Sequence, residues 1–381
     1  MLNRALKVIT SLKLTVVCLG IAVVLVFVGT LAQVHEGLYQ AQTRFFKSFL
    51  IYWSPQNANW RIPIFPGGYL VGSVLLANLI AAHITRFKMT RKKVGILMIH
   101  FGVILLLLGQ LLTDMLSTES AMKLQIGETK SFSEDFHDDE LVLVDTSDAN
   151  VDRVISVPDE KLAPGREVRL PSSPFAVRVK KFWANSDVVE SEVPGAEKIE
   201  TSAGAGAGNF VIAKPTSTKM DDRNVPAAIV ELLAGSKSLG TWFLSSQLRK
   251  QSFTHEGKTY DLALRFRRHY TPYSLTLLEC SHDIYKGTEI AKNFSSRIRV
   301  ENPENKESRE VLIYMNNPLR YAGTTFYQFQ MSLPGQPKSS TFQVVKNPSW
   351  LTPYFSCAMV GAGMAVQFLT HLFSFIKRRI S

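Results

Sequence analysis

Three histidines lie inside long apolar stretches of the chain, where ionisable side chains are rare and usually functional. They are His83, His100 and His371. A neutral imidazole at such a position can ligate a haem iron through one ring nitrogen, relay a proton, or bond a neighbouring carbonyl group. The proton relay is the weakest of these alternatives, because the apolar stretches contain no carboxylate and Asp114 lies at an outer edge.

Four apolar stretches are long enough to span a membrane, which takes about 20 residues. They divide the chain into membrane helices and one large region between the third and fourth helix. The predicted division is an N-terminal segment with the first span at 1–34, an outer loop at 35–66, the second span at 67–86, a cytoplasmic loop at 87–93, the third span at 94–113, a β-rich extracytoplasmic domain at 114–350, the fourth span at 351–376 and a cytoplasmic tail at 377–381.

The lysines and arginines predict the orientation of the spans. They cluster before the first span, in the segment RFKMTRKK between the second and third, and in KRR after the fourth. Basic residues favour the cytoplasmic side, so we expect both termini in the cytoplasm and the large domain on the periplasmic side of the cytoplasmic (inner) membrane. The first stretch follows a basic start like a signal peptide, but four passes require that it is retained.

The same topology predicts the depth of the three histidines. His100 lies a turn or two inside the cytoplasmic end of the third span, and His83 lies three residues before Arg86. His371 precedes the basic end of the fourth span by six residues, on the order of 9 Å at about 1.5 Å per residue. All three fall in the cytoplasmic leaflet, as expected for residues of one site.

Glycines recur every seven residues on the third span, at Gly95, Gly102 and Gly109. Small residues on one face let helices approach closely in lipid. This face either packs within the chain's own helix bundle or receives a partner subunit.

The large domain has the alternating pattern of antiparallel β-strands. Apolar residues alternate with polar ones over 260–266, 296–300 and 311–315, with turn residues such as Asn316, Asn317 and Pro318 between strands. The pattern predicts a sandwich or an open barrel. The sequence has no GxSxG, HExxH or GxxxxGK motif. The acidic run 138–140 beside His137 is more typical of a solvated face than of a metal site.

Charge and cysteines exclude other functions. The net charge of +11 is explained largely by basic residues beside the apolar stretches, so we expect no nucleic-acid partner. The three cysteines include no CxxC or CxxCH motif, which argues against a thiol oxidoreductase and against covalently attached haem.

Several stretches carry a family resemblance. They are SLKLTVVCLGIAVVLVFVGTLAQ, PGGYLVGSVLLANLIAAH, KKVGILMIHFGVILLLLGQ, YKGTEIAKNFSSRIRV, MNNPLRYAGTTFYQFQ and NPSWLTPYFSCAMVGAGMAVQFLTHLFSFIKRR. Together they resemble the ResB/CcsB family of system II cytochrome c biogenesis. The resemblance runs from end to end, with a poor match over about 140–255.

The resemblance implies a stand-alone, non-catalytic subunit of a cytochrome c haem-lyase or synthase complex. Its partners would be a CcsA/ResC-type membrane subunit, apocytochrome c and thiol-reducing membrane or periplasmic proteins, in a lipid bilayer. The complex would pass haem b in transit across the membrane to the thiols of apocytochrome c. The resemblance carries the role of axial ligand to His100 and a role in haem binding to His371 and His83.

One alternative uses the same architecture without haem. The chain would be a membrane-anchored β-domain that acts as a scaffold or chaperone for apocytochrome. A transporter of another ligand is disfavoured, because the sequence lacks inverted repeats and paired charges within the spans.

Overall fold

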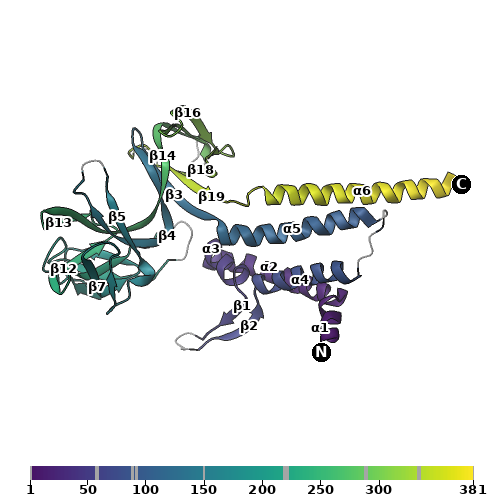
Figure 1. Ribbon diagram of the computed structural model, residues 1–381, viewed down its shortest axis with the longest axis horizontal. Helices are drawn as coiled ribbons and strands as arrows, with labels where there is room; N and C mark the ends of the chain where they lie inside the picture. Colours follow the sequence, from purple (N-terminus) through teal and green to yellow (C-terminus); the bar gives the residue numbers. More distant parts are fainter. Residues whose placement is uncertain are drawn as a thin grey trace. The chain divides into compact units, whose positions relative to one another are not determined.

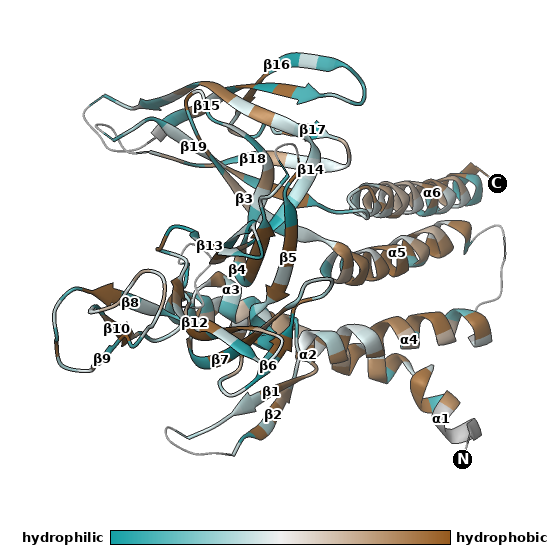
Figure 2. Ribbon diagram, turned by 60° about the vertical axis from the view of Figure 1, so that its left-hand side comes forward, coloured by the Kyte–Doolittle hydropathy of each residue, from teal (hydrophilic) through white to brown (hydrophobic). Residues whose placement is uncertain are grey.

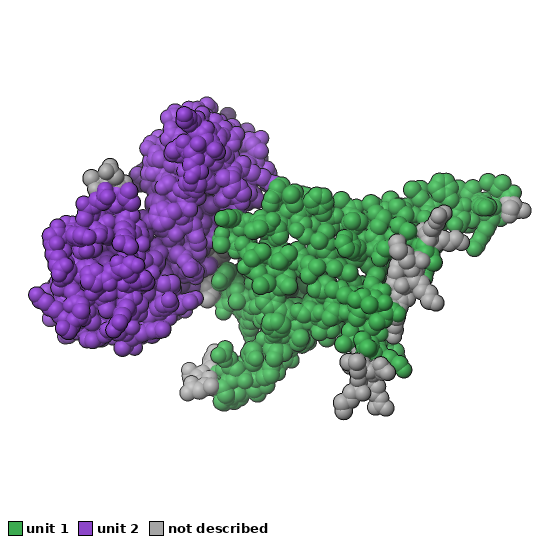
Figure 3. All heavy atoms as spheres, viewed as in Figure 1, with its two compact units in different colours: residues 1–118, 218–220, 346–381 green, residues 119–217, 221–345 purple. Residues whose placement is uncertain are grey.

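The computed structural model describes residues 2–55, 60–86, 90, 93–148, 151–217, 223–286, 291–332 and 336–380. Most of the predicted cytoplasmic loop, residues 87–89 and 91–92, lies outside this part of the chain. The chain divides into two compact units, shown in green and purple in Figure 3. The first comprises residues 1–118, 218–220 and 346–381, and the second comprises 119–217 and 221–345.

Four long apolar helices form most of the first unit (Figure 1). They are α2 (Leu12–Glu36), α4 (Gly68–Arg86), α5 (Val94–Leu116) and α6 (Thr352–Ile380). Each has the length and composition of a membrane span, α4 over Gly68–Thr85. Hydrophobic colours cover much of α4 and α5 in Figure 2, as expected for helices that lipid surrounds. The predicted four-helix membrane architecture is confirmed.

Shorter elements complete the first unit. They are α1 (Leu2–Ile9), α3 (Leu38–Ala41), the π-helical turn η1 (Gln42–Phe46), and the antiparallel strands β1 (Leu50–Trp53) and β2 (Ile62–Pro66). The buried side chains of Leu25, Ala41, Phe45 and Ile51 form a small core that holds α3, η1 and β1 against α2. The β1–β2 hairpin is therefore fixed at the end of α2, next to the start of α4.

Helices α5 and α6 pack along the predicted glycine face. A Cβ atom on Gly95 would lie 2.7 Å from the backbone of Gly363 and Gln367, and one on Gly102 would lie 2.7 Å from Val360. Gly109 faces Thr352 in the same way. Such contacts leave no room for a larger side chain, so this face is used for packing within the chain.

The second unit is built from antiparallel strands. Its ten-stranded sheet has the order β16-β15-β14-β4-β3-β19-β18-β17, with β13 paired to β14 and β5 paired to β4. The strands of this sheet are β3 (Thr118–Gln125), β4 (Thr129–Asp145), β5 (Arg153–Pro158), β13 (Gln251–His255), β14 (Lys258–Ile284), β15 (Ala291–Asn302), β16 (Glu307–Tyr314), β17 (Leu319–Tyr321), β18 (Thr324–Met331) and β19 (Ser339–Lys346).

Two smaller sheets accompany it. One has the order β12-β11-β7-β6 and the other β8-β10-β9. Their strands are β6 (Glu167–Arg169), β7 (Phe175–Trp183), β8 (Ser186–Val189), β9 (Ala196–Lys198), β10 (Phe210–Ala213), β11 (Ala227–Ala234) and β12 (Lys237–Ser245), and the turn η3 (Asp159–Lys161) follows β5.

The long strand β14 contributes to two hydrophobic cores, and β4 joins it in the first of them. Their buried residues Leu141, Leu143, Leu262 and Leu264 pack against strands β7, β11 and β12 and form a sandwich. Further along β14, a second core combines residues of β3, β14–β19, including Leu275. The sequence left a sandwich or an open barrel as alternatives, and the β-rich unit contains both.

The second core lies inside a nearly closed barrel. Its closing side is stabilised by polar contacts, in which the Ser296 hydroxyl on β15 donates to Gln328 Oε1 on β18 at 2.7 Å. The Tyr321 hydroxyl on β17 donates to Glu307 on β16 at 2.7 Å and accepts from Asn302 at 3.1 Å. Side chains thus connect the two ends of the strand order, β15–β16 and β17–β18.

Candidate functional site

Two of the three predicted histidines meet in the helix bundle. His83, near the end of α4, and His100, in the second turn of α5, lie with their ring centroids 4.8 Å apart and their planes perpendicular. His100 Nδ1 lies 3.1 Å from His83 Nε2. Both side chains are half-buried. The antiparallel arrangement of α4 and α5 produces this contact, because it brings the end of one helix level with the start of the next.

A backbone carbonyl fixes the protonation of the pair. His83 Nδ1 lies 2.9 Å from the carbonyl oxygen of Leu79, one turn earlier on α4. Because a carbonyl oxygen only accepts, Nδ1 carries the proton, and the lone pair of neutral His83 is on Nε2. The contact with His100 is therefore a hydrogen bond from His100 Nδ1–H to His83 Nε2.

The consequence for His100 is a free ligating atom. With its proton on Nδ1, neutral His100 has its lone pair on Nε2, and no residue in the described part of the chain hydrogen-bonds that atom. Histidines that bind metals commonly donate their other N–H to a second group, which orients the ring and raises its basicity. The arrangement suits a single axial ligand to a haem iron: His100 presents the lone pair, and His83 orients the ring.

His371 is not part of this pair. It lies exposed on α6, where its Nε2 accepts a hydrogen bond from the side-chain amide of Gln367 at 2.8 Å. The contacts of Gly95 and Gly102 with α6 put His100 level with residues near 360. His371 is thus about eleven residues away along the axis, roughly 16 Å at about 1.5 Å per residue, and cannot share one iron with His100.

A buried amide on α4 stabilises the other side of the bundle. Asn78 accepts a 2.6 Å hydrogen bond from the Thr15 hydroxyl and donates to the carbonyl oxygens of Ile9 and Ser11. These carbonyls lie at the break between α1 and α2, where the helical bonding pattern is interrupted. This role was not predicted from the sequence, although a lone asparagine in an apolar stretch is a signal of it.

The acidic run of β4 is structural and largely buried. Asp138 pairs with Arg267 at 2.6 Å, and Glu140 pairs with Arg265 at 2.9 Å. Asp139 and Glu140 are 5% exposed, so the prediction of a solvated face is wrong for them. No group of three or more potential ligands is arranged for a metal ion among the described residues.

The carboxyl group of Asp139 on β4 has a strongly raised pKa. Burial, together with the neighbouring carboxylates of Asp159 and Asp138, raises the pKa of its carboxyl group to about 8, against a smaller opposite effect of Arg223. No described residue hydrogen-bonds its Oδ1 atom. Asp139 is therefore a neutral acid near pH 7.

Comparison with known proteins identifies the C-terminal strands. Residues 227–349, from β11 to the segment before α6, match the ResB-like family. This part of the chain is therefore similar to the ResB-like family. The resemblance inferred from the sequence is confirmed, and the ResB-like region ends immediately before α6. His83 and His100 lie outside the matched residues.

A curated relative gives a shorter match. The chain is 28% identical over 138 residues to Protein NrfI of Wolinella succinogenes. The match covers 35% of this chain and 15% of that protein. The chain therefore spans a small part of the length of this relative.

The segment 316–327 is a tight connection within the ResB-like region. Strands β17 and β18 pair Tyr321 with Thr324, which leaves Ala322 and Gly323 as a two-residue turn. Both turn residues have positive φ angles, 47° and 75°, as a type I′ hairpin turn requires. The turn places the Tyr321 hydroxyl at the closing side of the barrel.

Proposed function

We propose that this ResB-like chain is a subunit of cytochrome c biogenesis that helps to deliver haem across the membrane and to attach it to apocytochrome c. The family match supports the biogenesis role. The observation that supports haem binding is the His83–His100 pair, which leaves Nε2 of His100 available. In this proposal haem is cargo in transit.

His100 and His83 have different roles in the proposed haem binding. His100 Nε2 provides one axial bond to the iron, and a CcsA/ResC-type subunit provides the second ligand and the attachment centre. His83 has both ring nitrogens in hydrogen bonds, so it acts as a positioning residue. Within this pair we therefore propose His100 as the iron ligand.

The position of the pair is consistent with haem entry from the cytoplasm. The distribution of basic residues puts the 87–93 loop on the cytoplasmic side, and His100 lies six residues after Val94, where α5 begins. This is on the order of 9 Å inside the helix. We place the β-rich unit on the periplasmic side, where apocytochrome is found.

A complementation experiment tests the function. We expect deletion of the gene to abolish holocytochromes c, measured by in-gel haem staining, and the wild-type gene to restore them. His100→Ala should not restore them, whereas His371→Ala should. Normal holocytochromes in the deletion strain would contradict the proposed function.

A triple variant distinguishes the alternative. If a chain with all three histidines replaced still restores holocytochromes, the β-rich unit acts as a tethered apocytochrome chaperone that does not bind haem. Immunoblotting of each variant checks that it accumulates in the membrane.

A further inference from the structure

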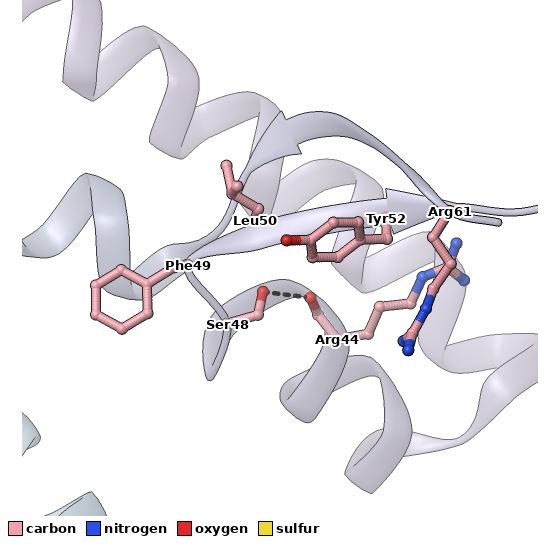
Figure 4. Close-up of a pocket in the computed structure, with 6 residues that line it drawn as sticks. All are labelled: Arg44, Ser48, Phe49, Leu50, Tyr52 and Arg61. Atoms are coloured by element: carbon pink, nitrogen blue, oxygen red, sulfur yellow. Dashed lines mark hydrogen bonds between the residues drawn. The ribbon is translucent and has the colours of Figure 1, made fainter.

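A surface pocket lies beside the β1–β2 hairpin, away from the histidine pair (Figure 4). Its volume is about 430 Å³. The residues that line it come from η1, from β1 and its approach, and from the segment before β2: Arg44, Ser48, Phe49, Leu50, Tyr52 and Arg61. Two guanidinium groups thus share one small pocket with aromatic and aliphatic side chains.

The fold builds this pocket rigidly. The Ser48 hydroxyl donates to the carbonyl oxygen of Arg44 at 2.6 Å, and the backbone N–H of Tyr69 donates to the carbonyl oxygen of Ser48 at 3.2 Å. Gly67 and Gly68 pack so closely on this turn that a Cβ atom on either would collide with it. These contacts attach the pocket to the first turn of α4, so it lies at an end of the membrane spans.

The charges of this end leave one cation uncompensated. Arg44 pairs with Glu36, and Lys47 pairs with Asp114 at 2.7 Å. Arg61 forms no ion pair with any described residue. Figure 4 shows the side chains of Arg44 and Arg61 extending to the same end of the pocket. Planar guanidinium groups match the oxygens of a phosphate, and a surplus of one positive charge matches a phosphodiester.

The surface around the pocket is apolar and aromatic. Five large apolar or aromatic side chains are exposed here: Leu50, Tyr52, Trp53, Trp60 and Ile64. The rings of Trp53 and Trp60 pack edge to face, with their centroids 6.5 Å apart. Exposed tryptophan and tyrosine at the end of a membrane span are typical of the lipid headgroup layer. An apolar rim around two arginines fits an amphiphile better than a soluble anion.

We infer that this pocket binds the phosphate of an anionic phospholipid, with Arg44 and Arg61 on the headgroup and the β1–β2 hairpin seated in the membrane interface. The bound lipid fixes the hairpin, and with it the junction of α2 and α4, at the membrane boundary. This inference does not depend on the proposed function.

The test is lipid binding by the full chain in neutral detergent micelles. The probes are dioctanoyl phosphatidylglycerol, dioctanoyl phosphatidylcholine and inorganic phosphate, and tryptophan fluorescence reports on Trp53 and Trp60. We expect saturable binding of phosphatidylglycerol, weaker binding of phosphatidylcholine, and no displacement by inorganic phosphate. Arg61→Gln should weaken phosphatidylglycerol binding about tenfold, the effect of one charge-assisted hydrogen bond.

Lys47→Gln is the matched control, because it removes one positive charge from the same end without altering the lining of the pocket. It should leave the binding constant within about twofold of the wild-type value. Equal losses of phosphatidylglycerol affinity in the two variants would show that the effect comes from general surface charge, and would overturn the inference. Displacement of the lipid by inorganic phosphate would assign the pocket to a soluble anion and overturn it as well. Equal melting temperatures confirm that the variants are folded.

Discussion

The buried Asp139 carboxyl group makes the stability of the β-rich unit depend on pH. Its pKa rises from 3.8, the ordinary value for the unfolded chain, to about 8 in the folded state. Between these two values the folded state holds one proton more than the unfolded state, so the free energy of unfolding falls as pH rises. The slope is about 1.4 kcal/mol per pH unit for one group. This contribution to stability is complete below the lower pKa and is lost as pH passes through the upper one.

Asp139→Asn removes this dependence, because the amide remains neutral and keeps the shape of the acid. From about pH 5 to about pH 7 the wild-type protein should lose about 3 kcal/mol more stability than the variant. At pH 7, removal of the titrating group should raise the free energy of unfolding of Asp139→Asn by about 4 kcal/mol relative to the wild-type protein. The net increase should be about 2 kcal/mol, because the amide brings two N–H donors that need partners.

The assay is urea unfolding of the full chain in detergent, followed by circular dichroism and tryptophan fluorescence. Asp187→Asn is the control, because Asp187 is only partly buried on β8 and pairs with Lys214. The free energy of unfolding of Asp187→Asn should change with pH at the same slope as that of the wild-type protein. Identical pH slopes for the wild-type protein and Asp139→Asn would refute the reasoning.

Three further perturbations test the packing. Gly102→Leu forces a side chain into Val360 on α6, and overpacking of this kind costs about 1–3 kcal/mol. The melting temperature in detergent should therefore fall. Gly20→Leu is the control and should not lower the melting temperature, because a Cβ atom on Gly20 meets no atom within 4 Å. Asn78→Leu leaves the Ile9 carbonyl group at the α1–α2 break without its donor, removes one of the donors to the Ser11 carbonyl, and should cost about 1–3 kcal/mol. Faster hydrogen exchange at the start of α2 would report this loss, and unchanged exchange would contradict the role. Cys280 is 6% exposed and burial raises its thiol pKa, so its alkylation at mildly alkaline pH should be slow until urea unfolds the barrel. Rapid labelling of Cys280 itself in the folded chain, located by peptide mapping, would contradict the packing of that core.

The helices and the general β character were predictable from the sequence. Apolar stretches of 18 residues or more admit few other structures in membrane proteins, and alternation of apolar and polar residues favours strands. The 27-residue strand β14 was not predictable. Its two halves face different cores, and long-range pairing with β4 makes them one strand.

The histidine site was predictable in part. Counting residues from the basic loop gave His83 and His100 similar depths, and the structure brings them into contact. Depth did not reveal the register of α6 against α5, which separates His371 from the pair. The hydrogen bond from His83 to Leu79 depends on atomic geometry, so the free Nε2 of His100 required the structure.

The most direct test of the account is the absorption spectrum of the chain purified with its CcsA/ResC-type partner. We predict a haem Soret band in the wild-type complex that is lost or shifted in His100→Ala and unchanged in His371→Ala. A Soret band that is the same in the wild-type complex and in His100→Ala would contradict the assignment of His100 as the axial ligand.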